Sequence, residues 1–184
     1  MAFDVVLALV ATTFTFYGLN FFVLGMVLLG RGELKDAGPI FLAAGGINGL
    51  IALTVFNANL APGGSGEFVV IAFLLLIFAV TWLAAGVVAI MGLGVKPIGS
   101  LGLFFGLTMI PFAVFVIQDG GAVVPIWQWL TINIISWIWV FFTLPLAFLF
   151  NVISPKVAGW SFVIQAFYTL WLPAALLLGS VAIG

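Results

Sequence analysis

The residues of this sequence that can do chemistry are neutral amides and hydroxyls placed inside long apolar segments. Gln165 lies early in FVIQAFYTLWLP (162–173), and Thr169 follows it by four residues, which places both side chains on one helix face. An amide in hydrocarbon is costly unless it is paired, so Gln165 requires a hydrogen-bond partner. Because its carboxamide holds both a donor and an acceptor, it can exchange hydrogen bonds with a small uncharged polar molecule.

Aromatic rings recur at the same helical spacing as these polar groups. In PIWQWLTINIISWIWVFFTLP, successive steps of four residues separate Asn133, Trp137 and Phe141, which therefore share one helix face. Two further sets of rings follow a similar pattern, namely Phe78 with Trp82, and Phe14 with Tyr17 and Phe21. The pattern places neutral polar groups among rings within the apolar segments, and Trp137, about a dozen residues into its span, could line a pore.

A plainer interpretation of the same residues stays open. Amides commonly bond across helices in membranes, so Asn133 and Gln165 could simply hold helices together. Trp137 could likewise pack against neighbouring helices or lipid. Gly45 and Gly49 form a G-x-x-x-G pair, which allows two helix backbones to approach closely, either inside a protomer or between protomers.

The composition restricts the class of protein. Of the 184 residues, 66% are hydrophobic and 5% are charged, whereas about a quarter of the residues in a soluble domain are charged. Cysteine and histidine are absent, which removes disulfides, thiolate chemistry, the commonest metal ligand and the commonest general base. The net charge of −1 provides no basic surface for nucleic acid. The sequence predicts an all-α integral membrane protein that is not an enzyme, with no cofactor and no nucleic-acid partner.

Apolar segments long enough to cross a bilayer organise residues 1–184 as one transmembrane domain, since a span needs roughly 20 residues. The six predicted spans are 5–30, 39–56, 68–91, 99–117, 125–150 and 157–183. All basic residues fall in alternate loops, at Arg31, Lys35, Lys96 and Lys156. By the positive-inside rule these loops face the cytoplasm. Both termini are therefore expected on the outer side of the cell membrane. Six spans are also compatible with two inverted three-helix halves around a central pore.

Several motifs, taken in their order and spacing, resemble the AmiS/UreI family of urea and short-chain amide channels. GLGVKPIGSLGLFFGLTMIPFA (92–113) is similar to the family's loop and fourth helix, and GWSFVIQAFYTLWLPA (159–174) is similar to its sixth helix. In the first half, LAAGG (42–46) and TWL (81–83) fall where the family carries related elements. The resemblance covers most of the chain.

The resemblance implies a homo-hexamer in the lipid bilayer, with a separate pore through the six helices of each protomer. Gln165 takes the place of the sixth-helix group that contacts the permeating amide, and Trp82 takes the place of a pore tyrosine. The other positions that correspond to pore-lining residues of the family are Phe78, Trp137, Phe141, Tyr17 and Phe21.

The sequence also departs from the family pattern. Leu24-Gly25 stands where the family has Asn-Gly, so that polar contact is missing or is replaced by Asn20. Family members that open in acid carry external histidines, and a chain without histidine is not expected to open in that way. Trp82 and the aromatic first-helix residues predict a narrower or less polar path than in the family.

The predicted function is a passive channel for small neutral solutes, with urea and short-chain aliphatic amides preferred. The predicted pore contacts are Gln165, Trp137, Phe141, Asn133, Trp82, Phe78, Thr169, Tyr17, Phe21 and Phe14. Two alternatives are kept. One is a conduit for an apolar or gaseous solute, and the other is a non-transporting membrane subunit of a larger complex.

Overall fold

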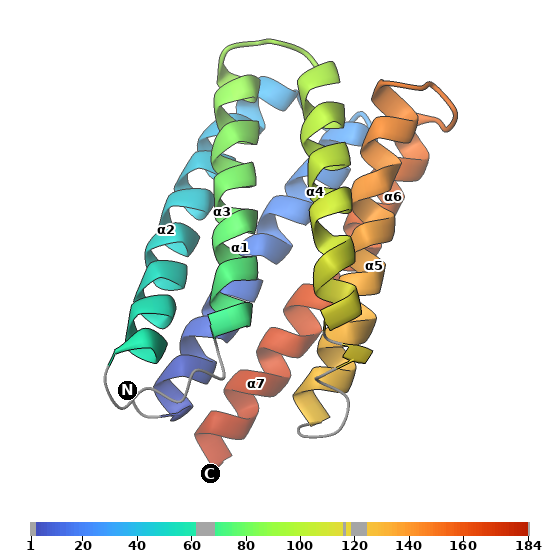
Figure 1. Cartoon of the computed structure of the whole chain (residues 1–184). Helices are drawn as coiled ribbons and strands as arrows, with labels where there is room; N and C mark the ends of the chain where they lie inside the picture. The colour runs from blue at the N-terminus through green and yellow to red at the C-terminus, as the bar shows by residue number, and fades with distance from the viewer. Residues whose placement is uncertain (1–2, 62–68, 116, 119–124, 184) are drawn as a thin grey trace.

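The computed structural model describes residues 3–61, 69–115, 117–118 and 125–183 (Figure 1). The helices are α1 (Phe3–Leu28), α2 (Leu34–Leu60), α3 (Val69–Ile90), α4 (Lys96–Phe115), α5 (Pro125–Phe148), α6 (Pro155–Gln165), the π-helix η2 (Ala166–Trp171) and α7 (Leu172–Ile183). Six spans in these ranges are long and apolar enough to cross a membrane, and α6, η2 and α7 together form the last one. The prediction of an all-α protein with six spans is confirmed.

The largest difference from the predicted spans concerns the second, where α2 extends beyond both limits of the segment 39–56. Asp36 lies in its first turn, where a negative charge is favoured by the helix dipole.

The C-terminal ends of α1 and α3 are each followed by a glycine with positive φ, which ends the helix within one turn. At the end of α1, Gly30 has a φ of 78° and its N–H donates to the carbonyl of Val27. The next N–H, that of Arg31, donates back to Met26, which completes a Schellman turn.

The helices pack as two antiparallel hairpins, α2 with α3 and α4 with α5, and α1 crosses against the last span (Figure 1). Small residues permit the closest crossings. A Cβ atom on Gly45 would lie 2.9 Å from the backbone nitrogen of Leu83 on α3, and one on Gly25 would lie 2.8 Å from the carbonyl oxygen of Gly159 on α6. Gly45 of the predicted G-x-x-x-G pair therefore serves packing inside the protomer, whereas the neighbouring Gly46 faces open space.

The charged ends of the bundle follow the predicted alternation. The four basic side chains are exposed and belong to the turns or first residues that precede or open α2, α4 and α6. These turns lie at the end of the bundle opposite to both chain termini (Figure 1). An even number of spans places both termini at one end, as expected.

Candidate functional site

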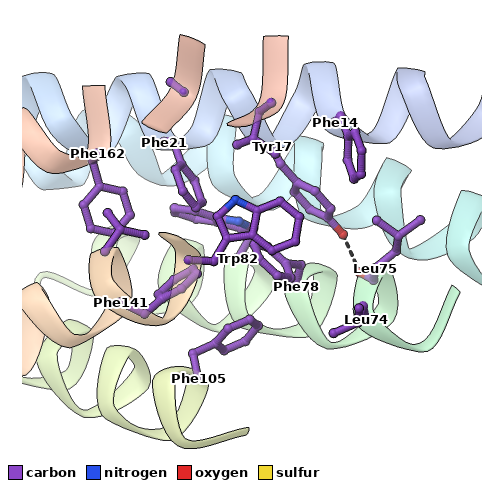
Figure 2. Close-up of a cluster of buried hydrophobic side chains, with 14 of the residues drawn as sticks. Phe14, Tyr17, Phe21, Leu74, Leu75, Phe78, Trp82, Phe105, Phe141 and Phe162 are labelled. Carbon is purple, nitrogen blue, oxygen red and sulfur yellow. Dashed lines mark hydrogen bonds between the residues drawn. The ribbon is translucent and has the colours of Figure 1, made fainter. Parts of the chain in front are cut away.

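An aromatic cluster fills the middle of the bundle with rings from every span, most of which are labelled in Figure 2. The cluster consists of Phe21, Phe41, Phe78, Trp82, Phe105, Phe141 and Phe162, all of which are buried. The ring centroids of Phe105 and Phe141 are 4.8 Å apart, and those of Phe78 and Phe105 are 5.0 Å apart with a near-perpendicular interplanar angle of 85°. Such tilted and edge-to-face pairs are the favourable geometries for rings, so the cluster closes the centre of the bundle with well-matched contacts.

Three more aromatic side chains extend the cluster toward the end of the bundle that holds the termini. Tyr17 lies 5.1 Å from Phe78 between ring centroids, and its hydroxyl donates a hydrogen bond to the carbonyl of Leu75 (Figure 2). Trp137 lies 5.0 Å from Phe78 and 6.1 Å from Phe14, edge-to-face in both pairs. The predicted aromatic residues of α1, α3 and α5 are thus brought together.

A small cavity of about 10 Å³ lies where these rings meet. Its lining consists of Phe14, Tyr17, Ile71, Leu74, Leu75, Phe78 and Trp137. A cavity of this size holds at most about one water molecule. The structure therefore has no room at this point for a solute with several heavy atoms.

A hydrogen-bonded link joins α5 to the last span beside this cavity. The indole Nε1–H of Trp137 donates to the hydroxyl oxygen of Thr169 over 2.9 Å. The same hydroxyl donates to the carbonyl oxygen of Gln165 over 2.8 Å. Thr169 is fully buried, so both hydrogen-bonding directions of its hydroxyl are used inside the protein in this closed arrangement.

The interior also contains three buried amides that lack partners, namely Asn20, Asn48 and Asn133. Neither the nitrogen nor the oxygen of these side chains has a hydrogen-bond partner among the described residues. The Oε1 atom of Gln165 and the Nε1 atom of Trp82 are buried without a partner in the same sense. Buried polar groups are nearly always paired in proteins, because an unpaired one costs about 1–3 kcal/mol. These groups therefore have unused hydrogen-bonding capacity inside the bundle.

The sequence profile described as AmiS/UreI family transporter matches residues 9–181. The chain belongs to the AmiS/UreI family. No curated protein matches the chain significantly in sequence. The resemblance read from the motifs is confirmed, and this AmiS/UreI family protein is a multi-pass membrane protein of a transporter family.

Two solved structures share the fold of this AmiS/UreI family protein. The cryo-electron microscopy structure of the Helicobacter pylori urea channel in a closed state is 19% identical, with a TM-score of 0.78. The crystal structure of the urea channel from the human gastric pathogen Helicobacter pylori is 20% identical, with a TM-score of 0.74. Each match covers 91% of this chain and 96% of the other chain. At this level of identity the likeness establishes a common fold.

The structure adds residues to the site that the sequence reasoning did not include. Phe105, Phe162 and Phe41 complete the aromatic cluster from α4, α6 and α2, and Asn48 joins the unpartnered amides. Helical spacing offered a weak signal for two of them. Phe162 lies three residues before Gln165, and Asn48 lies seven residues after Phe41 on the same face.

Proposed function

We propose that this protein is a passive channel for small neutral amides, with urea and short-chain aliphatic amides as its solutes. The family consists of transporters, and the two structures that share the fold are described as urea channels. The observation that carries the proposal is the environment of Asn133. This side chain is 1% exposed, lies one helical turn from Trp137, and has both amide atoms without a partner among the described residues.

The proposed path passes Trp137 and the aromatic cluster and reaches Gln165 on the last span. The rings of Phe14, Tyr17, Phe21, Phe78, Trp82 and Phe141 form its walls. Apolar walls cannot replace the hydration shell of an ion, so they exclude charged solutes, while a planar amide can slide between rings. Asn133, Gln165 and Thr169 supply neutral hydrogen-bonding groups, which bind a solute weakly enough to release it.

The proposal includes an orientation and an assembly. The end of the bundle with Arg31, Lys35, Lys96 and Lys156 faces the cytoplasm in the cell membrane, and both termini lie outside. Each protomer carries its own pore, and protomers associate as a homo-hexamer in the lipid bilayer. The exposed apolar side chains around the bundle, such as Phe104 and Leu176, suit contact with lipid or with neighbouring protomers.

Stopped-flow uptake of urea, acetamide and formamide into proteoliposomes tests the function. We expect saturable flux above empty liposomes, reduced at least about tenfold by Gln165→Leu, since the substitution removes a hydrogen bond to the solute. Gln118→Leu, which changes an exposed glutamine at the end of the fourth span, is the matched control.

A second pair of variants tests the position of the path. Trp137→Ala should change the flux, whereas Trp139→Ala on the same helix, whose side chain is 60% exposed, should not. If neither Gln165→Leu nor Trp137→Ala changes the flux, the protein is still a channel but the solute contacts lie elsewhere. No flux of any amide in a folded sample would contradict the proposal, and would favour an apolar conduit or a structural subunit.

A further inference from the structure

The last span is interrupted at the level of the site by the π-helix η2, which begins directly after Gln165 and contains Thr169. π-helical turns are rare and are often found at functional sites. Pro173, two residues beyond η2, has no N–H and cannot donate to the carbonyl of Thr169. Because that bond of the α-helical ladder is already lost, the widened turn is accommodated at this place.

The π-helix is anchored on its outer side by Trp171. The indole Nε1–H of Trp171 donates to the carbonyl oxygen of Thr15 on α1 over 2.9 Å. A Cβ atom on Gly18 would lie 2.4 Å from Nε1 of the same indole, so the ring occupies space that only a glycine leaves free. This contact holds η2 against α1 and thereby keeps the Thr169 hydroxyl at a defined position.

On its inner side the π-helix determines the orientation of Trp137. The other contacts of this indole, with Phe14 and Phe78, are edge-to-face ring contacts that tolerate rotation more easily than a hydrogen bond does. The bond from Nε1–H to Thr169 is the directional contact. If Trp137 turned away without replacing that bond, a buried donor would be left unpaired.

We propose that Thr169 is a specificity-determining residue that acts together with Trp137, an inference that rests on the proposed function. In the closed arrangement its hydroxyl holds the indole beside the cavity. When the indole turns and its bond to Thr169 breaks, both the indole N–H and the Thr169 oxygen need new partners. A solute that carries a carbonyl and an N–H on neighbouring atoms supplies both. Its oxygen accepts from Trp137 Nε1–H, and only this bond orients the solute so that its N–H reaches Thr169 Oγ1. A solute without a donor leaves the hydroxyl oxygen unpaired and passes less readily.

The test compares acetamide with dimethyl sulfoxide, which has the same number of heavy atoms and accepts hydrogen bonds but donates none. We expect the wild type and Thr169→Ser to prefer acetamide in proteoliposome flux. In Thr169→Val, which keeps the shape and removes the hydroxyl, the preference should fall about tenfold, the equivalent of one hydrogen bond. An unchanged preference in Thr169→Val, or an equal loss in Thr169→Ser, would overturn the inference.

A double-mutant cycle with Trp137→Phe separates joint action with the indole from a general effect on folding. Trp137→Phe removes the N–H and should reproduce the loss of preference, and Thr169→Val should then add nothing. If Thr169→Val does not fold, Trp137→Phe alone decides, because a retained preference in that variant contradicts the mechanism. An equal effect of Thr169→Val in both backgrounds would also contradict it.

A readout independent of flux separates this inference from the proposed function. In a ¹⁵N-indole NMR spectrum, the cross-peak that disappears in Trp137→Phe identifies Trp137. We expect that peak to shift in Thr169→Val and to stay near its original position in Thr169→Ser. Absence of wild-type amide flux would refute the channel, whereas an unmoved indole peak in Thr169→Val would refute the role of Thr169.

Discussion

The aromatic cluster and the buried amides lie in the same bundle but differ in how well their neighbours satisfy them. The rings of the cluster satisfy one another, since Phe21 contacts Phe162 at 4.9 Å and Phe141 at 5.6 Å between centroids. Asn20, Asn48 and Asn133 are equally buried, yet their amide atoms have no partner among the described residues. The closed arrangement is therefore stabilised by the rings and opposed by the amides.

This difference indicates what each region contributes to a channel. A protein selected for stability alone would replace unpaired amides by apolar side chains of similar shape, because that change is neutral or stabilising. In the proposed channel, amides that lack partners among the described residues gain hydrogen bonds when a polar molecule enters. In the same proposed channel, the rings keep the path shut and the amides lower the free energy of the occupied path.

The largest effect is expected from breaking the aromatic cluster at Phe78. Its ring contacts those of Tyr17, Phe105 and Trp137, so Phe78→Ala leaves a cavity at the centre. We expect a loss of about 3 kcal/mol in unfolding free energy, at the low end for buried phenylalanines because lipid adds little hydrophobic driving force. Denaturant titration in detergent micelles measures it. Phe104→Ala, at a 62% exposed position of α4, should lose less than about 0.5 kcal/mol.

The opposite behaviour is expected at Asn133. Asn133→Leu removes an unpaired amide, so the unfolding free energy should stay the same or rise by up to about 1 kcal/mol. Urea flux should fall about tenfold, because a hydrogen bond to the solute is lost. Asn59→Leu is the control, since the Asn59 amide is buried but donates to the carbonyl of Val55 over 2.8 Å. A marked loss of stability in Asn133→Leu would show that the amide has a structural partner.

Tyr17 extends the aromatic cluster, and the contribution of its hydroxyl can be separated from that of its ring. Tyr17→Phe keeps the contact with Phe78 and removes the hydrogen bond to the carbonyl of Leu75. We expect a loss of about 1 kcal/mol in unfolding free energy and a change in urea flux of less than about twofold. Tyr168→Phe, at a 54% exposed position, should change neither quantity. A large change in flux would assign the hydroxyl to the solute path.

The smallest effect is expected at Asn20, a fully buried amide on α1. Asn20→Leu should reduce urea flux about threefold, which corresponds to roughly 0.7 kcal/mol, without loss of stability. Asn57→Leu, which removes an exposed amide of α2, should leave the flux unchanged. Unaltered flux in Asn20→Leu would restrict the solute contacts to the α5 and α6 side.

Sequence patterns predicted the spans and much of the site. Long apolar segments must form helices in a bilayer, because each backbone polar group has to be satisfied within the segment. Helical spacing then placed Asn133, Trp137 and Phe141 on one face, and the structure buries Trp137 and Phe141 among the rings, while their contact with a solute stays a prediction. The direct pore contacts assigned to Gln165 and Thr169 stay a prediction, and the sequence held no sign that the Thr169 hydroxyl bonds Trp137.

What the sequence by itself determined is the set of six helices, their alternation across the membrane and the residues that share a face. Tertiary structure decided which faces meet, so that Phe105 and Phe41 enter the aromatic cluster while Phe104 points outward. The physical reason is that lipid and protein interior are similarly apolar, so a helix such as α3 is hydrophobic on every side. Only packing against the other helices distinguishes the inner face from the lipid face, and it leaves the buried amides without hydrogen-bond partners among the described residues.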